Sequence, residues 1–384
     1  MQIAKKKHEA EMKVDVVIGT RPEAIKMAPV ILELRARGGF SVRVIATGQH
    51  AEMLNQALNY FSLTADVNLG IMRREQTLDY IASAVLQGVG GTLDADRPDV
   101  VLVHGDTTTT LSAAMAAFYR RIPVGHVEAG LRSHDMSSPF PEEMNRVLTD
   151  RIASLWFAPT ELARRNLVSE GVPADEIRVT GNTVVDALHR TIKCVSAPKE
   201  SCMSQLLHGV PFILLTAHRR ESWGVPLERI CEALLEILRQ HGAYRALVPM
   251  HKNPVVRDTI SRILGKAPGV ILCDPLDYPD FVWAINSCKL ILSDSGGVQE
   301  EATALRKPVL ILRDVTERPE AIEHGSGVLV GADKSLIMAE ADRLLSDPAA
   351  YAEIVARCDG NPFGDGTASA KIADALSGVH KLAI

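Results

Sequence analysis

The chain has 384 residues, 46% of them hydrophobic, and carries 42 Lys and Arg against 47 Asp and Glu, a net charge of -5. This length predicts two or three domains with large cores. The charge balance and the lack of a dense basic face argue against a nucleic-acid partner, so an anionic ligand would have to meet local Arg and Lys.

The cysteines and apolar runs bear on where the protein works. The six cysteines are scattered, without a CxxC pair and with none in the first half, which favours reduced thiols in a cytoplasmic protein over disulfides or a zinc site. No apolar run approaches the ~18 residues of a membrane span. The basic start lacks the apolar segment of a signal peptide. Because the first predicted strand begins at Val14, residues 1–11 are expected to be a disordered extension, or Met12 the natural start.

The first half alternates short β-branched runs with longer helical patterns. Apolar residues recur at helical spacing in residues 22–37 and 107–121. Four runs predict buried parallel strands: residues 14–20, 41–48, 99–106 and 122–130.

The second half repeats this alternation, with helical spacing in residues 227–240 and 296–306. Its predicted strands are residues 211–218, 245–251, 270–276, 290–296 and 308–314. Continuously apolar strands are typical of parallel sheets covered on both faces. The sequence therefore predicts an α/β fold with two Rossmann-like, doubly wound domains.

The strand pattern lapses across residues 181–211, which places the domain junction there. We predict an N-terminal domain of residues 1–185 and a C-terminal domain of residues 186–365. A Gly-rich break precedes one last helix, so residues 366–384 are expected to pack back on the first domain. Ligands of open α/β sheets bind beyond the carboxyl ends of the strands, and a cleft between two facing domains is the expected site.

Three acidic residues stand where predicted strands and turns end. Asp106 closes one strand, Glu128 closes the next, and Glu142 follows a Pro-Phe-Pro turn. Taken alone, Asp106 is equally well explained as the N-cap of the following helix. Three carboxylates on one rim are costly unless they are paired or catalytic, so we interpret them as acid–base groups.

Two cations share the first predicted helix. Lys26 lies five residues after Arg21, among apolar neighbours. A solvated helix charge would be ordinary, but these neighbours favour a buried and therefore functional cation.

His218 directly follows a predicted strand and precedes Arg219 and Arg220. A lone histidine is more often structural. At a strand end beside two arginines, it can donate to a phosphate oxygen and help a leaving group depart.

The segment "SDSGGVQEEA", residues 293–302, follows a strand and opens a helix. The amides of Ser295, Gly296 and Gly297 there predict an anion cradle. The alternative is a serine N-cap with glycines that let helix and sheet pack closely. Glu301 is a candidate for sugar hydroxyls, although a glutamate early in a helix can simply offset the helix dipole.

Several common motifs are absent from the sequence. It contains no GxGxxG after a strand, no Walker A loop, no metal-ligand cluster and no GxSxG elbow, which disfavours a nicotinamide reaction. We expect no metal and no cofactor.

Eight motifs, in order and spread over nearly the whole chain, together resemble the bacterial non-hydrolysing UDP-N-acetylglucosamine 2-epimerases. They are "GTRPEAIKMAPV", "HGDTTTTL", "HVEAGLRS", "PFPEEMNR", "GNTVVDAL", "HRRES", "SDSGGVQEEA" and "TERPEA".

The resemblance implies a fold like the two-domain GT-B glycosyltransferases and a homodimer. The implied reaction interconverts UDP-N-acetylglucosamine and UDP-N-acetylmannosamine, with UDP expelled to leave a 2-acetamidoglucal and then re-added. The resemblance also implies that the product serves the synthesis of surface polysaccharide.

The resemblance also implies roles for individual residues. Asp106, Glu128 and Glu142 match the catalytic acids, His218 matches the group that assists UDP departure, and Lys26 and Arg21 lie near the substrate. The implied nucleotide contacts are Ser295, Gly296 and Gly297 at the diphosphate, Glu301 at the ribose, Phe281 at the uracil, and Arg318.

The chain departs from the family at a few positions. Many members read Gln-His-Arg where this chain has Gln49, His50 and Ala51, in a region linked to a second, activating substrate molecule. Loss of that arginine puts such regulation in doubt. Leu276 replaces a common glutamine near the uracil.

Four alternatives stay open. Within the class they are a 2-epimerase for a modified UDP-N-acetylhexosamine and a hydrolysing relative that releases free N-acetylmannosamine. A GT-B glycosyltransferase is disfavoured because sugar transfer needs at most one base. A non-catalytic sugar-nucleotide sensor is disfavoured by the three acids.

Overall fold

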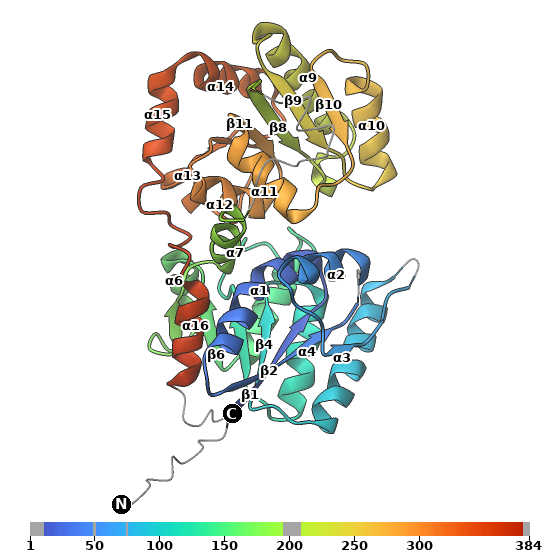
Figure 1. Cartoon of the computed structure of the whole chain (residues 1–384), viewed down its shortest axis with the longest axis vertical. Coiled ribbons are helices and arrows are strands. Elements are labelled where there is room, and N and C mark those ends of the chain that lie inside the picture. The colour runs from blue at the N-terminus through green and yellow to red at the C-terminus, as the bar shows by residue number, and fades with distance from the viewer. Residues whose placement is uncertain (1–10, 49–50, 74–75, 195–208, 379–384) are drawn as a thin grey trace, which may run out of the picture. The chain divides into compact units, whose positions relative to one another are not determined.

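The structure is a computed structural model that describes residues 11–48, 51–73, 76–194 and 209–378. The extension expected at residues 1–11 therefore lies, apart from Glu11, outside the described residues. The chain divides into two compact units, one of residues 1–187 with 366–384 and the other of residues 188–365 (Figure 1). Each is described by itself.

The first unit is built on a seven-stranded sheet in the order β3-β2-β1-β4-β5-β6-β7, with every pairing parallel. Its strands are β1 (Met12–Ile18), β2 (Phe40–Ala46), β3 (Val67–Asn68), β4 (Val100–His104), β5 (Val124–Val127), β6 (Leu155–Ala158) and β7 (Ile177–Val179). β1 starts two residues before the predicted Val14, because Met12 already pairs with Phe40. Three strands, β3, β6 and β7, were not predicted.

Helices flank this sheet (Figure 1). They are α1 (Arg21–Ala36), α2 (Ala51–Tyr60), α3 (Leu78–Ala95), α4 (Thr108–Tyr119), α5 (Glu142–Ile152), α6 (Glu161–Ser169), α7 (Thr183–Ile192) and α16 (Ala368–Ser377). The first helix begins with a capping box, in which Thr20 and Glu23 satisfy each other's backbone amides. The boundary between the units falls within α7.

The second unit has a six-stranded parallel sheet in the order β10-β9-β8-β11-β12-β13. Its strands are β8 (Phe212–Thr216), β9 (Arg245–Pro249), β10 (Val270–Cys273), β11 (Leu290–Ser293), β12 (Val309–Ile311) and β13 (Gly327–Leu329). The helices are η1 (Arg220–Ser222), α9 (Val225–Gln240), α10 (Pro254–Leu264), α11 (Tyr278–Ser287), α12 (Gly296–Ala304), α13 (Glu320–Glu323), α14 (Lys334–Ser346) and α15 (Pro348–Ala356).

The central strands are buried on both faces, as their continuous apolar character predicted. Every residue of β4, β8 and β11 is buried. In β8, Ile213 and Leu215 pack in one hydrophobic cluster, while Phe212 and Leu214 pack in another. Because side chains alternate along a strand, the two clusters lie on opposite faces of the sheet.

Both sheets have the strand order of a doubly wound Rossmann fold. The order reverses between β1 and β4 in the first sheet and between β8 and β11 in the second. Ligands of such sheets bind beyond the carboxyl ends of the strands at this switch point. The turns after these four strands are therefore where each unit is expected to hold a ligand.

The last helix belongs to the first unit. Helix α16, drawn in red, contacts α1 (Figure 1). Asp186 of α7 accepts hydrogen bonds from the backbone amides of Ala368 (3.1 Å) and Ser369 (2.8 Å). No helix within the described ranges is long and apolar enough to cross a membrane.

Candidate active site

Glu128 stands directly after β5, in a turn beside the switch point of the first sheet. Its φ of 70° is in the left-handed region, which side chains other than glycine rarely adopt. The amides of Glu128 and Ala129 both donate to the carbonyl of Phe157, at 3.1 and 3.2 Å. These bonds to β6 hold the turn and direct the carboxylate away from the strand.

Hydrogen-bond donors surround the carboxylate of Glu128. Lys26, buried in α1, forms an ion pair with Oε2, and Asn182 Nδ2 donates to the same oxygen at 2.7 Å. His104 Nε2 lies 3.6 Å from it. These contacts fix the orientation of the carboxylate beside a buried cation.

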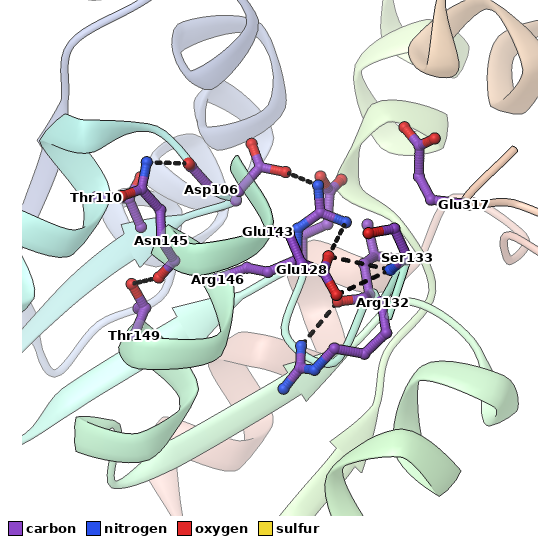
Figure 2. A network of polar contacts seen from close by, with 12 residues as sticks. Asp106, Thr110, Glu128, Arg132, Ser133, Glu143, Asn145, Arg146, Thr149 and Glu317 are labelled. Atoms are coloured by element: carbon purple, nitrogen blue, oxygen red, sulfur yellow. Dashed lines mark hydrogen bonds and ion pairs between the residues drawn. The ribbon is translucent and has the colours of Figure 1, made fainter. Parts of the chain in front are cut away.

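Asp106 follows β4 and is oriented from α5 (Figure 2). Arg146 Nη2 lies 2.7 Å from its carboxylate, and Asn145 Nδ2 donates to its backbone carbonyl at 2.9 Å. The N-cap of α4 is Thr107, whose side chain accepts from the amide of Thr110. The capping role considered for Asp106 is therefore wrong, and its side chain stays 28% exposed in an ion pair.

The two glutamates that open α5 differ in their surroundings. Glu143 is 1% exposed and accepts from the amides of Ser133 (3.0 Å) and His134 (2.9 Å). Its carboxylate also lies 3.4 Å from Arg146, which connects it to Asp106. Glu142, the predicted acid, is the first residue of the helix and half-buried. Sequence spacing could not separate the structural member of this pair from the other.

A buried ionic network supports both turns. His126, on β5, contacts Asp150 through Nδ1 (2.6 Å) and the carbonyl of Gly105 through Nε2 (2.8 Å). Asp150 Oδ2 also lies 2.8 Å from Arg132 Nη1 and accepts a hydrogen bond from the amide of Gly130 at 3.1 Å. Burial would raise the pKa of Asp150, but His126 and Arg132 outweigh it and lower that pKa. The sequence pattern did not identify this network.

His218 and Asp294 meet at the switch point of the second sheet. Asp294 directly follows β11 and is fully buried, and His218 follows β8 with its side chain 41% exposed. The carboxylate accepts from the amides of His218 and Arg219, both at 2.9 Å, and from Ser222 Oγ at 3.0 Å. Asp294 is a functional candidate that sequence reasoning missed, although it lies within the motif of residues 293–302.

The predicted anion cradle coincides with the start of α12. Ser295 is the N-cap residue, but its side chain makes no capping hydrogen bond. The interpretation of Ser295 as a side-chain N-cap is therefore wrong. Gly296 and Gly297 form the first turn of the helix. Glu301 is its sixth residue and buried, beyond the first turn where a glutamate would offset the helix dipole.

Arg318 lies against this helix start within a buried ionic cluster. Its guanidinium contacts Glu300 (2.5 Å) and Glu317 (2.7 Å), and a Cβ added at Gly296 would collide with it. The glycine thus allows Arg318 to approach the backbone. Burial would raise the pKa of Glu317, but Arg318, Arg313 and neighbouring charges outweigh it and lower that pKa far below its usual range.

The remaining predicted residues lie on or near other helices. Arg21 is the first residue of α1, and Phe281 is half-buried on α11. Leu276 is 8% exposed. Gln49 and His50 lie outside the described residues. Within the described ranges, no group of three or more His, Cys, Asp or Glu is arranged to hold a metal ion.

Comparison with known proteins agrees with these observations. A family model described as UDP-N-acetylglucosamine 2-epimerase matches residues 32–377. The UDP-N-acetylglucosamine 2-epimerase of Escherichia coli (strain K12) is 50% identical over 372 residues, which cover 95% of this chain and 98% of the relative.

Solved structures extend the agreement to the fold. The crystal structure of UDP-GlcNAc 2-epimerase from Neisseria meningitidis, bound to UDP-GlcNAc, is 44% identical with a TM-score of 0.89, covering 95% of this chain and 100% of that one. The structure of the Methanocaldococcus jannaschii UDP-GlcNAc 2-epimerase, in complex with UDP-GlcNAc and UDP, is 35% identical with a TM-score of 0.82. The match covers 95% of this chain and 99% of that one. The chain therefore belongs to the UDP-N-acetylglucosamine 2-epimerase family, a family of isomerases.

Proposed function

We propose that this protein reversibly epimerises UDP-N-acetylglucosamine at C2 to UDP-N-acetylmannosamine, without net hydrolysis. The observation that carries the proposal is the placement of Asp106 and Glu128 after neighbouring strands, each carboxylate beside a cation. The position that a Cβ of Gly105 would take is 3.7 Å from Glu128 Oε1. The two acids are thus delivered to one rim of the sheet.

The chemistry explains why more than one acid is required. The C2 hydrogen has no adjacent carbonyl to stabilise a carbanion, so its removal must be coupled to loss of UDP from C1. In this step the C2–H electron pair forms the C1=C2 bond of a 2-acetamidoglucal, and the C1–O pair leaves with the diphosphate. Return of a proton to the opposite face of C2 needs a second group. Glu128, Asp106 and Glu142 are the proposed proton-transfer groups.

The second unit is proposed to hold the nucleotide. The amides at Ser295, Gly296 and Gly297 open a helix whose N-terminus favours the diphosphate. Glu301 is assigned to the ribose, Phe281 to the uracil and His218 to the departing phosphate. Arg21 and Lys26 are placed near the sugar.

Deuterium exchange tests the proposal. Incubation with UDP-N-acetylglucosamine in deuterated water, followed by NMR of the C1 and C2 protons, should give UDP-N-acetylmannosamine that carries deuterium at C2. Product without deuterium would rule out solvent-exchanged proton transfer. Free N-acetylmannosamine would indicate a hydrolysing enzyme. Turnover only of a modified UDP-sugar would indicate a 2-epimerase of different specificity, and transfer of the sugar to an acceptor would indicate a glycosyltransferase.

The proposal also covers assembly and location. The product would serve surface polysaccharide synthesis, and the working form would be a homodimer, which a monomer mass in solution would contradict. The cysteines in the described ranges are free thiols. Burial raises the pKa values of Cys231 and Cys288 to about 12, which makes these thiols unreactive. A cytoplasmic location fits free thiols.

A further inference from the structure

We infer that Asp294 is a positioning residue that fixes the ring orientation and the tautomer of His218. This inference rests on the proposed role of His218 in the departure of UDP. It assigns to a fully buried aspartate a function that the match to known proteins does not supply.

The two residues are brought together by strand pairing. Strands β8 and β11 are parallel neighbours in which Thr216 is paired with Ser293, and their hydroxyls lie 2.8 Å apart. His218 lies two positions after Thr216, and Asp294 lies directly after Ser293. The distance between the two side chains is therefore set by the central part of the sheet.

The two oxygens of Asp294 have different surroundings. Oδ2 accepts three hydrogen bonds, from the amides of His218 and Arg219 and from Ser222 Oγ. Oδ1 has no hydrogen-bond partner among the described residues, and His218 Nδ1 lies 3.3 Å from it. The three donors fix the carboxylate, so that Oδ1 faces the histidine ring.

The charge of this carboxylate decides which nitrogen carries the proton when the His218 ring is neutral. Burial would raise the pKa of Asp294, but the His218 side chain and the backbone amides of His218 and Arg219 outweigh burial and lower it. An ionised oxygen beside Nδ1 favours an N–H there. In the doubly protonated ring, Nε2 is then the nitrogen whose proton can pass to the departing diphosphate.

A second histidine, His251, has the opposite arrangement, in which Nδ1 carries no proton. His251 stacks on His218 with ring centroids 5.7 Å apart, and its Nδ1 accepts from the amide of Asn253 at 3.1 Å. Burial, followed by the charge of His218, lowers the pKa of His251. His251 therefore stays neutral beside His218 at neutral pH.

The proton balance of the elimination follows from this arrangement. A carboxylate takes the C2 proton, the C1–O bond breaks, and the phosphate oxygen takes the Nε2 proton of a doubly protonated His218. The ring that remains carries its proton on Nδ1, which is the tautomer that Asp294 stabilises. On re-addition of UDP, the phosphate proton returns to Nε2, while a second acid delivers its proton to the opposite face of C2.

The test is Asp294→Asn. The amide oxygen can still accept from the three donors that now bind Oδ2, so the loop should keep its conformation. The amide NH2 would face His218 Nδ1 and disfavour a proton there. We expect the epimerisation kcat to fall by about 100-fold or more, while the Kd for UDP measured by calorimetry stays close to that of the wild type.

A spectroscopic measurement separates this inference from the function itself. In protein labelled with 15N-histidine and free of substrate, the His218 signals, assigned with His218→Gln, should show a proton on Nδ1 in the wild type and a bare Nδ1 in Asp294→Asn. Ser222→Ala, which removes one donor to Oδ2, is the control and should keep the wild-type pattern.

Either of two results would overturn the inference. One is a bare Nδ1 in wild-type protein, and the other is an Asp294→Asn variant with more than a tenth of wild-type turnover. A wild-type protein that shows the expected tautomer but does not epimerise would refute the proposed function and leave the positioning of His218 intact.

Discussion

Glu128 combines an unfavourable backbone conformation with a favourable side-chain environment. A non-glycine residue in the left-handed region costs on the order of 1 kcal/mol, and such residues cluster at functional sites. At Glu128 the conformation is held by two hydrogen bonds to β6. The carboxylate then reaches Lys26 and Asn182, which lie far from it in sequence. The strained turn thus positions an acid between its donors.

Replacement of Glu128 by Gln keeps the size of the side chain and removes the carboxylate. Turnover measured with UDP-N-acetylglucosamine should fall at least ~100-fold, because positioned acid–base groups usually contribute that much. UDP binding should be nearly unchanged. The matched control is Glu33→Gln near the end of α1. It removes an ion pair with Arg37, the C-cap residue of that helix, and should keep its activity. Activity of Glu128→Gln above a tenth of wild type would exclude the acid–base role.

The lowered pKa of Glu317 makes the second unit sensitive to acid. With a folded-state pKa far below that of the unfolded chain, Glu317 contributes its full stabilisation at neutral pH. Below about pH 4.3 the unfolded chain takes up a proton while the native carboxylate does not, and this stabilisation falls by about 1.4 kcal/mol per pH unit.

Urea unfolding of wild type and Glu317→Gln between pH 7 and pH 3 measures this loss. The stability difference between the two proteins should be largest at neutral pH and shrink below pH 4.3. The same exchange at exposed Glu323 is the control and should change the stability at neutral pH far less than Glu317→Gln does. A constant difference for Glu317→Gln would mean that its ion pairs do not lower the pKa.

At the scale of elements, one glutamate connects the two turns at the switch point of the first sheet. Glu23, 2% exposed on α1, accepts from the amides of Gly19 and Thr20 after β1. Its other oxygen accepts from the hydroxyls of Thr107 and Thr110 at the start of α4. The first turn of α4 directly follows Asp106, so Glu23 sets the separation of the two strand ends.

This close approach predicts that Gly19 tolerates no side chain. A Cβ there would lie 2.5 Å from Thr109 Oγ1 and 2.7 Å from Thr47 Oγ1, so Gly19→Ala should shift the turn and lower both stability and turnover. Gly91→Ala on α3 is the matched control, since nothing lies within 4 Å of its Cβ position. That change should stabilise the helix by up to about 1 kcal/mol. Thermal melts that rank the two variants the other way would contradict this explanation.

At the scale of the whole molecule, the chain leaves the first unit near residue 188 and returns to it at residue 366. The return is secured by Asp186, which accepts from two amides of α16 and from Ser369 Oγ. The N-cap residue of α16, Thr367, makes no side-chain cap. A residue 182 positions before Ala368 therefore acts as the cap of the last helix.

Asp186→Ala should loosen α16 without unfolding the second unit. It leaves buried amides without an acceptor, which costs about 1–3 kcal/mol. Hydrogen exchange of a peptide covering residues 368–377 should rise sharply, whereas peptides from β8 and β11 should keep their protection. Ser369→Ala removes only one of the three donors and should give a smaller rise. Unchanged exchange in α16 would show that other contacts hold the helix.

Much of this protein was determined by local sequence. Continuous apolar runs predicted the central strands, and Asp106, Glu128 and His218 were identified because each closely follows such a run. β3 and β7, with two and three residues, are too short to show a periodic pattern. The family followed from eight motifs in register, which need no knowledge of contacts.

Only the tertiary structure decided which of these residues meet and what holds them. Lys26 and Glu128 are 102 residues apart, and His218 and Asp294 are 76 apart. Their contacts depend on a strand order that places β4 beside β1 and β11 beside β8. The tertiary structure also distinguished the role of Glu143, which holds a loop, from that of Glu142. Secondary structure is set by neighbouring residues, whereas contact across a sheet depends on how all its strands pack together.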